Sequence, residues 1–185
     1  MVSGSVFLDE STALLGRTPR ILHELLTDLP DGWLGDPDTV GGWTARDVVG
    51  HLISGELEDW IPRAEIILRD GTSRPFDPFD RFAHVDRDVG VPLANLVERF
   101  GELRAQSLDR LRELVRDDTD LERRGRHPEL GEVTLRQHLA TWAVHDLDHV
   151  AQVYSSLAAS RDAEVGPWKA YLGILLRRDA EKPTS

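Results

Sequence analysis

The chain has 185 residues, of which 40% are hydrophobic and 30% charged, a balance typical of a soluble globular domain. Its formal net charge is -11 and its arginines are interleaved with acidic residues, which argues against a nucleic-acid partner. The absence of cysteine excludes a disulfide scaffold, a cysteine metal ligand and a cysteine nucleophile. Neither a signal peptide nor an apolar stretch of the ~20 residues needed to span a membrane is visible, so we expect a cytoplasmic protein without a membrane partner.

Apolar residues at helical spacing dominate the chain, and strand-like alternation is weak. The first helical segment is expected over Val6 to Leu29, with a break at Thr18-Pro19, where the proline lacks a backbone donor and Thr18 can cap a new start. The second helix is expected from about Ala45 to Arg69. Thr44 is its predicted N-cap, with Asp47 three residues on.

The middle of the chain is expected to contain a long loop, Asp70 to Val89, which carries Phe76, Phe79 and Phe82. A loop of this length in a compact domain is often functional. The three aromatic side chains could shield a pocket, although such residues more often pack onto the bundle. A third helix is expected from about Val91 to Val115.

The last third of the chain begins with a second connection, Asp117 to Gly131. Thr134 and Gln137 then form a capping box, which predicts the start of a fourth helix that runs to about Ala159. A short final helix is expected over Pro167 to Asp179.

Four long helices and a short fifth predict an all-α helical bundle. We expect a single domain over residues 1–179 and a disordered tail over residues 180–185.

His145 and His149 are four residues apart on the fourth predicted helix. At ~100° per residue they differ by only ~40° around the helix axis, so their imidazoles can converge on one point. His-x-x-x-His on a helix is a recognised arrangement for a divalent metal, but a lone pair of this kind is a weak signal. A helical wheel places both residues at the border of a broad apolar arc, from which they can point into the bundle.

Asp146 falls near the middle of the same apolar arc, where a carboxylate must be paired or hydrogen-bonded. Two interpretations are open. The carboxylate either forms a structural salt bridge with an arginine of another helix, such as Arg63 or Arg104, or orients a metal ligand or binds substrate.

The remaining histidines give weaker signals. His51 lies among apolar residues beside Gly50 and Gly55, whose small size allows close helix approach, and by itself this pattern favours a core histidine. His138 lies ~10 Å along the helix from the predicted pair, too far to share one ion, so we favour a surface residue over one that lines the cavity. His84, in the phenylalanine-rich loop, could fold over the site.

Two stretches of the chain carry recognisable motifs. The first is Gly41-Gly42-Trp43-Thr44 followed by Asp47-Val48-Val49-Gly50-His51-Leu52, and the second is the segment from His127 to Leu135 followed by His145-Asp146-Leu147-Asp148-His149-Val150-Ala151-Gln152-Val153. Together they resemble the DinB/YfiT-like superfamily over nearly the whole chain. The resemblance implies an antiparallel four-helix bundle, commonly a homodimer, with one metal ligand from the second helix and two from the fourth. These positions are His51, His145 and His149.

Three neutral imidazoles with an open coordination position are the pattern of catalytic zinc, and all-nitrogen ligation would also suit nickel or iron. The superfamily includes thiol-dependent S-transferases and a mycothiol-dependent isomerase, so the resemblance implies a small-molecule substrate and a low-molecular-weight thiol such as mycothiol. We therefore expect a metal-dependent thiol S-transferase or isomerase. The alternatives are a non-catalytic metal- or small-ligand-binding module and a metal-assisted hydrolase. A hydrolase would need a general base, for which Asp146 and Glu58 are the candidates.

Overall fold

The computed structural model describes residues 5–35, 37 and 42–180, with side chains up to residue 176. Gly41 of the first motif and the part of the predicted disordered tail beyond Ala180 lie outside the described residues.

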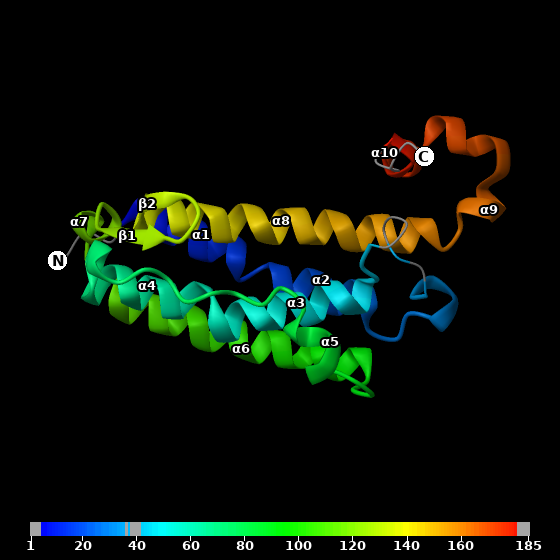
Figure 1. Cartoon of the computed structure of the whole chain (residues 1–185). Helices are drawn as coiled ribbons and strands as arrows, with labels where there is room; N and C mark the ends of the chain where they lie inside the picture. The colour runs from blue at the N-terminus through cyan, green and yellow to red at the C-terminus, as the bar shows by residue number, and fades with distance from the viewer. Residues whose placement is uncertain (1–4, 36, 38–41, 181–185) are drawn as a thin grey trace.

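Four long helical segments lie side by side and form a bundle (Figure 1). They are, in chain order, α1–α2 (Val6–Leu15 and Thr18–Leu26), α3–α4 (Ala45–Glu58 and Trp60–Arg69), α6 (Leu93–Leu114) and α8 (Leu135–Ala159). Segments α3–α4 and α6 run in one direction, whereas α1–α2 and α8 run in the opposite direction (Figure 1). The predicted all-α bundle is confirmed, with antiparallel packing between these two pairs.

The connection between α4 and α6 is long because the two segments run in the same direction, so the chain must return along the bundle before α6 begins (Figure 1). This return segment was predicted as a loop, but it contains a 3-10 turn, η2 (Gly71–Ser73), and a short helix, α5 (Ala83–Arg87). The buried Phe76 is held to the bundle by its backbone N–H, which donates to the Arg126 carbonyl at 2.9 Å. Helix α5 packs against α3.

Two predicted helices are divided in the structure. The first breaks at the expected proline, but Thr18 is the first residue of α2 and Arg17 is its N-cap, so the predicted capping role of Thr18 is wrong. The second, predicted as continuous, breaks at Asp59, whose backbone angles are φ -111° and ψ -71°. Pro62 explains this break, because it cannot donate to the Glu58 carbonyl and its ring crowds that oxygen.

The predicted connection before α8 folds into a short helix and a hairpin. Helix α7 (Asp118–Leu121) precedes strands β1 (Arg124–His127) and β2 (Gly131–Thr134), which pair antiparallel. Strands of four residues are too short to show the alternation that would predict them. The hairpin delivers the chain directly to Thr134, whose capping box with Gln137 starts α8 as predicted.

The C-terminal region also differs from its prediction. Instead of one helix it contains α9 (Asp162–Val165), a 3-10 helix η3 (Gly166–Tyr171) and α10 (Gly173–Ala180). A further 3-10 turn, η1 (Asp31–Trp33), follows α2. No helix within the described ranges is long and apolar enough to cross a membrane.

The buried apolar side chains form two clusters, toward opposite ends of the bundle. One includes Leu15, Ile67, Leu111 and Leu139, and the other includes Leu22, Leu52, Phe100 and Val153. Three helical segments each carry a buried polar residue between the part that contributes to one cluster and the part that contributes to the other. These residues are Glu56 on α3, Arg104 on α6 and Asp146 on α8. We call these three residues the polar layer.

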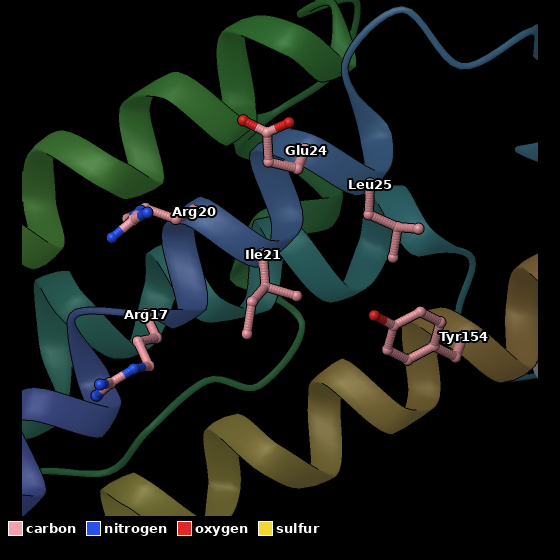
Figure 2. A pocket seen from close by; sticks show the side chains of 6 residues that line it. All are labelled: Arg17, Arg20, Ile21, Glu24, Leu25 and Tyr154. Carbon is pink, nitrogen blue, oxygen red and sulfur yellow. The ribbon is translucent and has the colours of Figure 1, made fainter.

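A separate groove lies between α2 and α8, lined by Arg17, Arg20, Ile21, Glu24, Leu25 and Tyr154 (Figure 2). It contains none of the predicted metal ligands, so it is distinct from the histidine site.

Candidate metal centre

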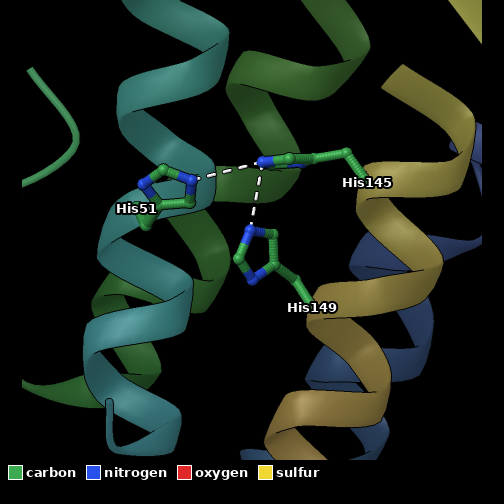
Figure 3. Close-up of side chains that lie close together, drawn as sticks. All are labelled: His51, His145 and His149. Atoms are coloured by element: carbon green, nitrogen blue, oxygen red, sulfur yellow. Dashed lines mark hydrogen bonds between the residues drawn. The ribbon is translucent and has the colours of Figure 1, made fainter. Parts of the chain in front are cut away.

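The three predicted ligands meet inside the bundle. His51 points from α3 toward His145 and His149, which point from successive turns of α8 (Figure 3). The Nε2 atom of His145 lies 3.2 Å from that of His51 and 3.0 Å from that of His149. These three residues form a group that could hold a metal ion, with ligand atoms all within 4.8 Å of one another.

Hydrogen bonds on the outer side of the rings orient two of the ligands. The Nδ1–H of His51 donates to the Arg81 carbonyl at 3.3 Å, and the Nδ1–H of His149 donates to Gln152 Oε1 at 2.8 Å. A neutral imidazole that is protonated on Nδ1 keeps its Nε2 lone pair free. Both rings therefore turn an unprotonated nitrogen toward His145, the tautomer that a metal ligand requires.

Two of the three separations between the inner nitrogens are close to those around one ion, while the whole group of ligand atoms spans up to 4.8 Å. Two nitrogens bound to a single zinc ion at ~2.0–2.1 Å in a tetrahedral arrangement lie ~3.3 Å apart. The observed separations from His145 are 3.0 and 3.2 Å. The one Nε2 hydrogen that His145 could carry cannot satisfy two facing lone pairs fully, whereas a cation would satisfy all three nitrogens.

Burial keeps the three imidazoles in their neutral, metal-binding form. Desolvation, assisted by the charge of the neighbouring His149, lowers the pKa of His51 to about 3 and that of His145 to about 2. Desolvation also lowers the pKa of His149. At neutral pH protons therefore do not compete with a metal for these nitrogens.

Aromatic side chains form the walls of the site. The Trp43 ring lies 4.7 Å from the His51 ring and stacks at 6.0 Å on His149, while Phe79 meets the edge of His51 at 5.6 Å. The Trp60 ring contacts His145 at 5.0 Å. The sequence assigned neither tryptophan a place at the site: Trp43 appeared only as part of the first motif and Trp60 only within a predicted helix, because an apolar residue gives no signal of what it will face.

The phenylalanine-rich segment divides between two roles. Phe79 contacts His51, and Phe82 contacts the edge of Trp43, so both lie beside the site. Phe76 instead is buried in the core near His138.

The return segment also places His84 beside the histidine site. Its buried ring lies 5.2 Å from Trp43 and 6.3 Å from His51, so it does reach the site. Gly50 makes this approach possible, because a Cβ atom there would lie 2.9 Å from His84 Cβ and 2.8 Å from Asp88 Oδ2.

Neither predicted candidate for a general base is available. Asp146 is fully buried, and Arg104 pairs with both its oxygens at 2.5 and 3.0 Å, so the salt-bridge interpretation is the one that the structure supports. Glu58 is exposed near the end of α3. Within the described part of the chain, no carboxylate oxygen joins the cluster of ligand atoms.

His138 differs from its predicted position. It is buried rather than on the surface, and its Nε2–H donates to the Trp60 carbonyl at 2.9 Å. The bond joins α8 to the first residue of α4, directly after the break at Asp59. This residue is a structural core histidine.

Comparison with known proteins decides the family. The sequence model of the DinB superfamily matches residues 14–153, a span that includes all three histidines. The chain belongs to the DinB superfamily. The matched span also covers α2, α3, α4 and α6 and most of α8.

Known proteins are similar to most of the chain, one of them by its structure and others by sequence. The structure of YfiT from Bacillus subtilis, described as "a probable metal-dependent hydrolase with an unusual four-helix bundle topology", matches with a TM-score of 0.70 and 26% identity, over 84% of this chain and 89% of YfiT. A protein of Oceanobacillus iheyensis named "putative metal-dependent hydrolase" is 28% identical over 78% of this chain and 81% of its own length. A Bacillus mycoides protein of the same name is 28% identical over 74% and 78%.

Proposed function

We propose that this protein is a divalent-metal-dependent enzyme that transfers a low-molecular-weight thiol, such as mycothiol, to a small electrophilic substrate. The observation that carries this proposal is the convergence of three neutral imidazole nitrogens without a carboxylate beside them. His51, His145 and His149 would hold the ion, with zinc the first candidate and nickel or iron the others.

The donor set determines what a bound ion can do. Three neutral ligands leave the charge of a divalent ion uncompensated, and the bound ion would lower the pKa of a thiol or water at its open position. A thiol that has lost its proton to solvent attacks an electrophile without further help, whereas hydrolysis also needs proton transfer to the leaving group. The pairing of Asp146 with Arg104 and the exposure of Glu58 therefore favour thiol transfer.

The chain's own residues would bind and orient the reactants. Trp43 and Phe79 provide apolar faces against which the organic part of a substrate can pack and from which water is displaced. Gln152 and the Arg81 carbonyl fix the ring orientation of two ligands.

Hydrolysis is the second candidate, because the similar proteins from Oceanobacillus iheyensis and Bacillus subtilis are described as metal-dependent hydrolases. A third possibility, a module that binds metal or a small ligand without turnover, shares the same ligands. The first two candidates differ in the reactants that they consume, and the third consumes none.

One experiment separates these functions. Metal content is measured in wild type and in His51→Ala, and both are assayed with a panel of thiols plus an electrophile, and with ester and amide substrates without thiol. We expect at least tenfold less bound zinc in His51→Ala, and thiol-dependent turnover in wild type only. Equal metal content in the two proteins would overturn the ligand assignment. Turnover without thiol would establish hydrolysis, and metal binding without any turnover would establish the binding module.

A further inference from the structure

Arg104 makes an unusually complete set of contacts inside the bundle. Its Nε donates to Glu56 Oε1 at 2.9 Å, and one terminal nitrogen lies 2.7 Å from the same oxygen and 3.0 Å from Asp146 Oδ1. The other terminal nitrogen donates to Asp146 Oδ2 at 2.5 Å and to the Leu15 carbonyl at 2.9 Å. The five N–H groups of a guanidinium thus meet five contacts, on α1, α3 and α8.

The side chain of Arg104 is enclosed on all sides by the bundle. Its side chain is 1% exposed, and those of Glu56 and Asp146 are 0% and 1% exposed. The guanidinium carbon lies 4.9 Å from the Phe100 ring and 5.0 Å from the Trp142 ring, which hold it by cation–π contacts. Although burial opposes its charge, the neighbouring carboxylates raise its pKa.

Stability alone is a poor explanation for such a cluster. Replacing a buried ion pair or triad by apolar residues of similar volume is often neutral or stabilising, because burial of charge is costly. The best-attested benefit of a buried polar group is instead that it selects one register between helices.

The polar layer connects the two helices that carry the ligands. Asp146 directly follows His145 on α8, and Glu56 lies five residues after His51 on α3. A shift of one helix along the other by one residue moves a side chain ~1.5 Å, whereas metal–ligand distances tolerate only ~0.2 Å. Apolar contacts such as those in the two clusters accommodate small shifts, but a fork that contacts both carboxylates does not.

We propose that Arg104, with Glu56 and Asp146, is a positioning cluster that fixes the register of α3 against α8 and so holds His51 at ligand distance from His145 and His149. The proposal rests on the metal-binding part of the proposed function and is independent of the reaction. Arg104 acts on the site through the helices and touches neither the ion nor a substrate.

The test separates metal binding from stability. In the triple variant Glu56→Met/Arg104→Met/Asp146→Leu the layer becomes apolar at similar volume. We expect it to fold with wild-type stability in urea but to bind zinc at least tenfold more weakly, measured by competition with a chromophoric chelator. With Co²⁺ in place of zinc, we expect the visible absorption of the tetrahedral site to weaken or shift, a readout that a purely structural role would not move.

A matched control uses an exposed ion pair that also joins two helices. Arg110 of α6 pairs with Glu65 of α4 at 2.7 Å, and Glu65→Gln/Arg110→Met should leave zinc affinity and the Co²⁺ spectrum unchanged. If the triple variant does not fold, Asp146→Asn replaces it, because this change keeps the side-chain shape. We expect that variant, while folded, to bind zinc at least threefold more weakly.

The two levels of failure are distinguishable. If wild type binds no divalent metal, the proposed metal site fails. If wild type binds zinc, and the folded variant binds it with the same affinity and the same Co²⁺ spectrum, the positioning role of Arg104 is overturned while the metal site stands.

Discussion

His138 is a buried histidine that titrates apart from the metal ligands. Its Nε2–H bond to the Trp60 carbonyl favours protonation, but desolvation is the larger effect and lowers its pKa to about 4. In the unfolded chain the pKa of histidine is about 6.5. Between these values the unfolded state binds a proton that the folded state does not, so stability that is present above about pH 6.5 is lost as the pH falls.

We therefore expect acid to destabilise the metal-free protein partly through this one residue. Between pH 7.5 and pH 5, wild type should lose about 2 kcal/mol more unfolding free energy than His138→Gln, which keeps a donor for the Trp60 carbonyl. Urea denaturation in the presence of a chelator measures the difference. Substitution of the exposed His23 by Gln should not reproduce the effect, and an equal pH dependence in wild type and His138→Gln would contradict it.

At the level of single residues, the sequence predicted which side chains share a helix face better than it predicted their partners on other helices. The spacing of His145 and His149 places both on one helix face, so their meeting was predictable from local geometry. His51 is 94 residues away from His145, and only the family resemblance connected it to the pair. The same limit applies to Asp146. Its burial followed from the helical wheel, but the choice of Arg104 over Arg63 depended on how separate helices pack.

Helix α5 shows how a single glycine positions an element. A Cβ atom on Gly50 would approach both His84 Cβ and Asp88 Oδ2 to less than 3.0 Å. Gly50→Ala should therefore displace α5 from α3 and destabilise the protein by ~1–3 kcal/mol, the usual cost of overpacking. Chemical denaturation of the variant checks this prediction.

Gly101→Ala on α6 is the matched control for this substitution. Its added methyl group would lie 3.7 Å from Pro19 Cβ, an ordinary contact. A helical Gly→Ala change without a clash should stabilise the protein by ~0.5–1 kcal/mol. Loss of stability of the same size in both variants would show that close approach at Gly50 is not the cause.

Elements whose limits are encoded locally were predictable. The capping boxes at Thr44 and Thr134 place their first hydrogen bonds within three residues, and both are present in the structure. The break at Asp59 and the β1–β2 hairpin were not predicted. The break depends on Pro62, which lies three residues after it within an otherwise helical pattern. The hairpin depends on pairing between strands too short to show a pattern.

At the scale of the whole molecule, an exposed apolar face of α8 bears on self-association. Val144, Leu147 and Tyr154 lie along one side of the helix and are 63%, 52% and 44% exposed. A second copy of the chain is the partner we predict for this face, as the family resemblance implies, because in a two-fold dimer one face can serve both subunits.

Light scattering after size exclusion should accordingly give about twice the chain mass of 20.8 kDa for wild type. Leu147→Glu should give the mass of a single chain, because the charge would be buried in the contact. Leu130→Glu, which changes an equally apolar but 74% exposed residue of the hairpin turn, should behave as wild type. A single-chain mass for wild type would rule out the homodimer at the concentration used.

The polar layer also divides the interior into two small cores. Regions of a protein can open locally with different free energies, so we expect the two ends of the bundle to differ in local stability when no metal is bound. His51 lies among residues of one cluster on α3. On α8, His145 comes shortly after Trp142 and Ala143, which belong to the other cluster. A metal ion bound by both helices would link the two clusters. It would couple local unfolding at the two ends of the bundle, and loss of the ion would lower the local stability of both ends.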